Sequence, residues 1–169
     1  MDPLENWRRR KVLPHIRGRL LDLGCGFNNL VRAYDGTAGV GVDVFGWPGI
    51  DVLIASAARL PFRTAAFDTV TIIAALNHIP NREAALTEVH RVLRPDGRLI
   101  LTMISPLVGA MAHIMFKRDE KTRGGMSAGE KNGLRRGEVV SLLSASGFAL
   151  RRTEPFQLWL NCVYVAEKL

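Results

Sequence analysis

Apolar runs and amphipathic segments follow one another along most of this 169-residue chain. The apolar runs at 19–23, 38–44, 67–76 and 98–104, with a weaker one at 50–55, are typical of buried strands. Segments 29–34 and 82–93 have helical spacing; Gly36 ends the first, and Pro95 with Gly97 ends the second. Strands that alternate with helices in this way predict a parallel sheet covered by helices.

The second half of the chain continues the same pattern around one unusual segment. We expect an apolar helix over 107–116 and then a mobile lid, rich in glycine and charge, within the segment 105–133. A helix that ends at Gly147 and strand-like runs at 148–156 and 160–169 complete the pattern. The chain is therefore expected to be one domain, 1–169, in which residues 1–18 form an N-terminal cap.

Composition excludes several classes of protein. Leu99 to Phe116 are free of charged residues, but Pro106 divides the stretch, which reads better as a strand and a helix than as a transmembrane span. The first residues have no secretory-type apolar run, so we expect a cytoplasmic protein. Cys25 and Cys162 are far apart and predict free thiols, with no disulfide framework and no metal site.

The chain is basic, with 23 Lys and Arg against 16 Asp and Glu and a net charge of +7. The excess lies in clusters at 7–11, 117–123, 135–136 and 151–152. Such clusters permit an acidic substrate, nucleic acid or an anionic membrane surface as partner. Trp7 alone accompanies the arginines, so the nucleic-acid signal is weak. A basic RNA-binding or membrane-surface-binding protein nevertheless stays an alternative function.

The strongest chemical signal is the glycine turn after the first strand. Its sequence, Gly24-Cys25-Gly26-Phe27-Asn28-Asn29, lacks the third glycine of a dinucleotide-binding fingerprint. Asn28, within this turn, either tolerates the local backbone or caps the helix. Asp22 would repel a pyrophosphate but suits an ammonium group, which favours a ligand with an amino acid end over a nicotinamide cofactor. Asp43, at the next strand end, could accept hydrogen bonds from two ribose hydroxyls.

Four ordered blocks carry a family resemblance, namely DLGCG, GVGVDV, ARLPFRTAAFDTVTIIAALNHIPN and EVHRVLRPDGRLIL. Together they resemble the class I S-adenosylmethionine-dependent methyltransferases, most closely the small-molecule "type 11" branch. The resemblance implies a Rossmann-like, seven-stranded, mostly parallel α/β sheet with helices on both faces and an antiparallel last strand. It also implies S-adenosylmethionine as cofactor, S-adenosylhomocysteine as product and a small-molecule acceptor.

The resemblance further implies a set of cofactor-binding residues: Asp22, Gly24, Cys25, Gly26, Asp43, Val44, Ser56, Ala57, Ala58 and Ala75. Phe45 follows Asp43 and could pack on one face of the adenine. The family often has an acid where this chain has Ser56. Because a neutral hydrogen bond is weaker than a charged one, the change is expected to lower cofactor affinity about tenfold.

On the acceptor side, His78 is the candidate general base, or else it braces its loop, and Asn77 and His113 are candidate substrate contacts. The segment 105–133 would shape the acceptor pocket; its apolar helix suggests a partly apolar acceptor and the arginines suggest an anionic one. Ser56 and Asn28 leave a second alternative open, a non-catalytic S-adenosylmethionine-binding domain or partner subunit.

Overall fold

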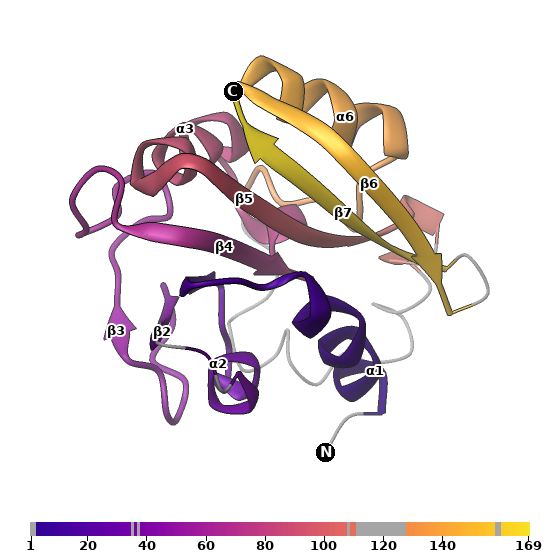
Figure 1. The fold of residues 1–169 in the computed structure, drawn as a ribbon. Coiled ribbons are helices and arrows are strands. Elements are labelled where there is room, and N and C mark those ends of the chain that lie inside the picture. The colour runs from indigo at the N-terminus through magenta and orange to yellow at the C-terminus, as the bar shows by residue number, and fades with distance from the viewer. Residues whose placement is uncertain (1–2, 35, 37, 108, 111–127, 158–159) are drawn as a thin grey trace.

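The computed structural model describes residues 3–34, 36, 38–107, 109–110, 128–157 and 160–169 (Figure 1). Along the chain the elements are α1 (Pro3–Val12), the 3-10 turn η1 (Leu13–His15), β1 (Arg19–Leu23), α2 (Asn29–Ala33), β2 (Ala38–Asp43), β3 (Val52–Leu53), β4 (Phe67–Ile73), the 3-10 turn η2 (Leu76–His78), α3 (Arg82–Val92), β5 (Leu93–Ile104), α6 (Arg136–Ala145), β6 (Phe148–Phe156) and β7 (Asn161–Lys168).

The strands form one seven-stranded sheet in the order β3-β2-β1-β4-β5-β7-β6. The pairs β2–β3, β1–β2, β1–β4 and β4–β5 are parallel, whereas β7 is antiparallel to both β5 and β6. This topology confirms the predicted mostly parallel sheet with an antiparallel last strand. Chain order reverses between β1 and β4, and ligands of such sheets collect beside that switch point, outside the carboxyl ends of the strands.

Helices cover both faces of the sheet, as predicted (Figure 1). On one face, Val89 of α3 and Val139 of α6 belong to the larger core cluster, which also holds Leu99 and Leu101 of β5. On the other face, Val12 and Leu30, from α1 and α2, form a smaller cluster with Ile100 of β5 and with Val163 and Val165 of β7. Successive β5 residues alternate between the two clusters because successive side chains of a strand point to opposite faces.

Three local features differ from the expectation. The strand expected over 67–76 ends at Ile73, because Ala74 has a φ of +53° and its N–H donates to Thr102 Oγ1 (3.0 Å). The strand expected over 50–55 is reduced to Val52–Leu53, at the edge of the sheet. Helix α1, which the apolar pattern did not predict, occupies most of the expected cap.

Most of the expected apolar helix 107–116 and lid, including His113, lies outside the described residues. Within the described part of the chain, none of the helices has the length and apolar character that crossing a membrane requires.

Candidate functional site

The glycine turn bends from the end of β1 over the end of β2. The N–H groups of Gly24 and Cys25 both donate to the carbonyl oxygen of Val42, at 2.8 and 3.1 Å. Gly24 has a φ of +76°, and a Cβ there would lie 2.6 Å from the Cβ of Ala75, so only glycine fits. A Cβ on Gly26 would meet none of the described atoms within 4 Å. The space beside Gly26 is therefore open to a ligand.

Asp43 joins the turn to the end of β2. Its Oδ2 accepts a hydrogen bond from the N–H of Gly26, and its Oδ1 accepts one from the N–H of Phe45, each at 3.0 Å. The carboxylate is 9% exposed. Since each carboxylate oxygen has two acceptor sites, both oxygens retain one for a further donor, as a pair of ribose hydroxyls requires.

Asp22 is a buried carboxylate beneath the same turn, 3% exposed. Thr71, its partner in the β1–β4 register, donates its hydroxyl to Asp22 Oδ1 at 2.6 Å. Burial raises the pKa of Asp22 from 3.8 to about 7; the Thr71 hydrogen bond opposes this rise, and the charge of Asp43 adds to it. A cationic group at the turn would stabilise the ionised form of Asp22, which therefore suits a ligand ammonium.

Asn28 supports the turn from below. It adopts the left-handed backbone conformation, with a φ of +61°, and its side chain does not cap α2. Instead its Nδ2 donates to Gly49 O and to Asp51 Oδ2, both at 3.0 Å, and Asp51 Oδ2 also accepts from Gly41 N–H at 2.7 Å. Asn28 therefore tolerates the left-handed backbone and does not cap the helix, which is the first of its two expected roles.

Aromatic side chains border the turn. The ring centroids of Phe45 and Trp47 are 4.7 Å apart, and those of Phe27 and Trp47 are 5.1 Å apart. Val44, beside them, is 61% exposed. This group places flat apolar surface next to Asp43, where an aromatic ring of a ligand could pack.

The remaining predicted cofactor residues differ in exposure. Ser56 is exposed, and its Oγ accepts the N–H of Ala58 at 3.1 Å, while Ala57 is buried. Cys25 is half-buried; burial and the charges of Asp22, Asp43 and Asp51 raise the pKa of its thiol to about 12. The thiol is therefore protonated at neutral pH and is no nucleophile.

Asn77 and His78 take part in a hydrogen-bond network with residues 129–131. His78 Nδ1 lies 3.0 Å from Glu130 Oε2, and His78 Nε2 lies 3.1 Å from Asn77 Nδ2. Asn77 Nδ2 also donates to Lys131 O at 3.1 Å, and Lys131 N–H donates to Asn77 O at 2.9 Å. Arg82 donates to Asn77 O and to Gly129 O. Both ring nitrogens of His78 thus contact groups of the protein itself, which favours the bracing role.

The structure therefore brings together a buried carboxylate that suits an ammonium group, a second carboxylate that suits hydroxyls, an open glycine turn and an aromatic border. These features fit the three parts of an S-adenosyl amino acid. Thr71, Asp51 and Glu130 complete the site and were not among the predicted residues. Thr71 alone had a sequence signal, as a polar residue inside a buried apolar run.

Comparisons with known proteins agree with this geometry. A family model described as a methyltransferase domain matches residues 21–101. The chain is 30% identical to demethylmenaquinone methyltransferase of Thermus thermophilus over 181 aligned positions, which cover 86% of this chain and 82% of the relative. The chain belongs to the S-adenosylmethionine-dependent methyltransferases, in the type 11 branch.

Solved structures show the same fold. An S-adenosylmethionine-dependent methyltransferase from Mesorhizobium loti has a TM-score of 0.71 and 21% identity, with 95% of each chain covered. The 1,6-didemethyltoxoflavin-N1-methyltransferase of Burkholderia thailandensis, solved with bound 1,6-didemethyltoxoflavin and S-adenosylhomocysteine, has a TM-score of 0.69 and 18% identity. That alignment covers 98% of this chain and 78% of the other.

Proposed function

We propose that this enzyme methylates a small-molecule acceptor at the carboxyl ends of β1, β2 and β4. The observation that carries the proposal is the pair Asp22 and Asp43, two buried carboxylates on adjacent strands, which flank a glycine turn with open space beside it. The named relatives, which act on demethylmenaquinone and on 1,6-didemethyltoxoflavin, support a small molecule as acceptor.

In this proposal Asp22 binds the ammonium group of the cofactor and Asp43 binds the ribose hydroxyls. The N–H groups of Gly26 and Phe45 hold the Asp43 carboxylate in place, so its orientation is set before the ligand arrives. Phe45 and Val44 would contact the adenine, and Ser56, Ala57 and Ala58 would complete its binding site. When bound, S-adenosylmethionine supplies an activated methyl group, and holding donor and acceptor in line contributes about 7–11 kcal/mol to lowering the barrier.

The acceptor side of the proposal involves Asn77 and His78. Glu130 orients the His78 ring through Nδ1, as a general base requires, but Nε2 contacts the Asn77 amide. An acceptor that gives its proton to His78 must displace that amide. A catalytic role for His78 therefore stays a prediction, and a positioning role through residues 129–131 is what the contacts favour. The substrate contacts predicted for Asn77 and His113, and the cytoplasmic location, also stay predictions.

Calorimetry with S-adenosylhomocysteine tests the cofactor part of the proposal. We expect binding of micromolar order in the wild type and at least about tenfold weaker binding in Asp43→Asn, because a carboxylate that accepts two hydroxyls loses its charge and one acceptor. Asp96→Asn, at an exposed position near the start of β5, is the matched control and should bind like the wild type. Equal affinity of Asp43→Asn and the wild type would remove Asp43 from the site.

Turnover is tested separately. Incubation with methyl-labelled S-adenosylmethionine and a panel of phenolic, quinol and heteroaromatic acceptors should transfer label to at least one of them. Cofactor binding without transfer to any acceptor would support the alternative of a non-catalytic cofactor-binding domain.

A further inference from the structure

A hollow of about 650 Å³ lies between α1, η1 and β6. Its volume is within the range of about 300–1,000 Å³ that small-molecule sites occupy. The lining residues that bear on its chemistry are Trp7, Arg10, Lys11, His15, Arg152 and Glu154. None of them belongs to the cofactor or acceptor residues described above. The hollow is therefore lined by a different set of residues from the cofactor site.

The charged side chains that line the hollow carry a net positive charge. Arg10 and Lys11 are exposed on α1 and have no acidic partner among the described residues. Glu154 is the one acidic lining residue, and it is already paired: its Oε1 lies 3.1 Å from His15 Nε2 and also contacts Arg152. With Glu154 and Arg152 neutralising each other, two positive charges are left for a ligand.

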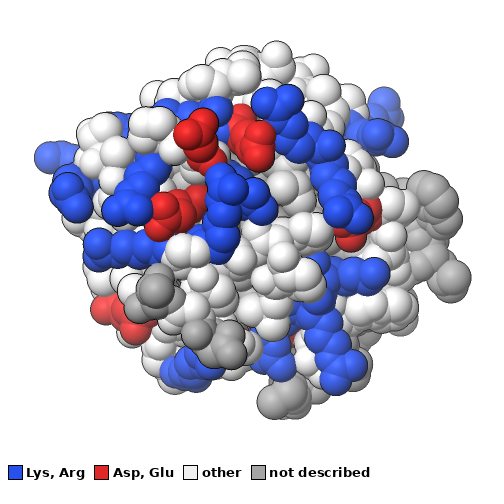
Figure 2. All heavy atoms as spheres, in the orientation of Figure 1, with Lys and Arg blue, Asp and Glu red and all other residues white. Residues whose placement is uncertain are grey.

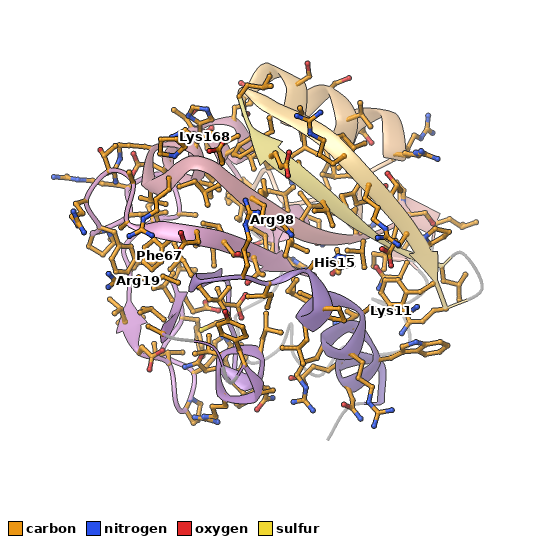
Figure 3. The ribbon with its side chains drawn as sticks, in the orientation of Figure 1. Lys11, His15, Arg19, Phe67, Arg98 and Lys168 are labelled. Atoms are coloured by element: carbon orange, nitrogen blue, oxygen red, sulfur yellow. The ribbon has the colours of Figure 1, made fainter. Side chains whose placement is uncertain are left out.

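Basic side chains predominate on the face of the molecule that contains the hollow (Figure 2). Lys11, on α1, and His15, just after that helix, lie on the side of α1 that is toward the adjoining ends of β6 and β7 (Figure 3). On the face that contains α1, basic side chains are more numerous than acidic ones (Figure 2). Because these two cations, Arg10 and Lys11, line a hollow, they raise the local concentration of anions there more than the same charges on a flat surface would.

Trp7 adds a flat apolar wall to these cations. Its side chain is 46% exposed, and one edge contacts the ring of Phe156 at a centroid distance of 6.4 Å in a T-shaped arrangement. The contact with Phe156, a buried residue at the end of β6, holds the indole in place while much of its surface stays accessible. A half-exposed, supported indole is a suitable surface for stacking with an aromatic ring.

We propose that this hollow binds a small acidic molecule that carries a flat apolar ring, such as an aryl phosphate or aryl carboxylate. Arg10 and Lys11 bind the anionic group, for which the planar guanidinium of arginine is well matched, and Trp7 packs against the ring. The inference does not rest on methyl transfer. Its failure would leave the proposed function untouched, because the binding test uses the protein without cofactor.

Calorimetry with 1-naphthyl phosphate is the test. We expect a dissociation constant below about 1 mM for the wild-type chain. The double variant Arg10→Glu/Lys11→Glu should bind at least tenfold more weakly. Arg59→Glu/Arg63→Glu, which makes the same charge change at two exposed arginines before β4, is the matched control and should bind like the wild type. Trp7→Ala should weaken binding of 1-naphthyl phosphate and leave binding of inorganic phosphate unchanged.

Several results would overturn the proposal. Equal losses in the two double variants would show that only net charge matters. Binding of neutral 1-naphthol as tight as that of 1-naphthyl phosphate would remove the anion from the recognition. If Arg10→Glu/Lys11→Glu abolished binding to phosphatidylglycerol vesicles while the wild type did not bind 1-naphthyl phosphate, the basic residues would serve a membrane surface instead. Circular dichroism of each variant verifies that it is folded; all the substituted side chains are exposed.

Discussion

Asp22 is expected to destabilise the folded protein at neutral pH. Its pKa is raised by burial from 3.8 to about 7, so the folded state binds a proton on Asp22 more tightly than the unfolded state does. Stability from this group is therefore full below pH 4 and declines as the pH rises toward 7. An asparagine in its place cannot ionise, and its side-chain oxygen can still accept a hydrogen bond from the Thr71 hydroxyl. Asp22→Asn should thus be more stable than the wild type, and increasingly so at higher pH.

The magnitude follows from the two pKa values. One pH unit corresponds to about 1.4 kcal/mol, so relative to a pH below 4 the raised pKa of Asp22 lowers the free energy of unfolding by about 4 kcal/mol at pH 8 and about 2 kcal/mol at pH 5. Urea unfolding followed by circular dichroism, on the wild type and Asp22→Asn at both pH values, measures this difference. Other groups, such as Asp68 and Glu88, whose pKa values are lowered, titrate in both proteins. Their contributions to the free energy of unfolding therefore cancel in the difference between the two.

The control for this experiment is Asp96→Asn, an exposed position where we expect less than about 0.5 kcal/mol at either pH. A stability difference between Asp22→Asn and the wild type that is the same at pH 5 and pH 8 would refute the reasoning, because it would show that Asp22 ionises normally in the folded state.

Three further predictions concern the site. Because an ammonium ligand stabilises the ionised form of Asp22, the wild type should bind S-adenosylhomocysteine about tenfold more weakly at pH 5.5 than at pH 7.5, while Asp22→Asn should bind it weakly at both, as calorimetry can measure. Ser56→Asp should bind S-adenosylhomocysteine up to about tenfold more tightly, since a charged acceptor replaces a neutral one; unchanged or weaker binding would contradict the role assigned to this position. His78→Gln should reduce kcat less than about tenfold and preserve the pH profile of the rate, because the contacts of His78 favour positioning; a loss of about 10²–10⁴-fold, with disappearance of the acidic limb, would instead make His78 the general base.

The strands were predictable from sequence where they are buried on both faces. Leu20, Ile72 and Ile100 lie in such strands, and each stands next to another apolar residue in its run. The strand β3 has β2 as its one partner at the edge of the sheet, so its pattern was weak and the strand is only two residues long. Helix α1 escaped prediction because arginines and Lys11 dominate it and its one residue in the smaller core cluster is Val12.

The site was predictable as far as it depends on local sequence. The positions of Asp22 and Gly24 follow from the strand and the turn after it, and Asp43 from the end of the next strand. The residues that form hydrogen bonds to the side chains of the site could not be predicted in the same way. Thr71 reaches Asp22 only through the register of β1 against β4, and Glu130 reaches His78 from 52 residues along the chain. Such contacts are decided by tertiary packing, which no local pattern encodes.

The most direct test of the cofactor site is a crystal structure of this chain with S-adenosylhomocysteine. We predict that the amino group of the ligand lies beside Asp22 and that its two ribose hydroxyls donate to the carboxylate of Asp43, with the glycine turn unchanged. A complex in which the ligand lies elsewhere, or in which the Asp43 carboxylate faces away from the sugar, would contradict the account.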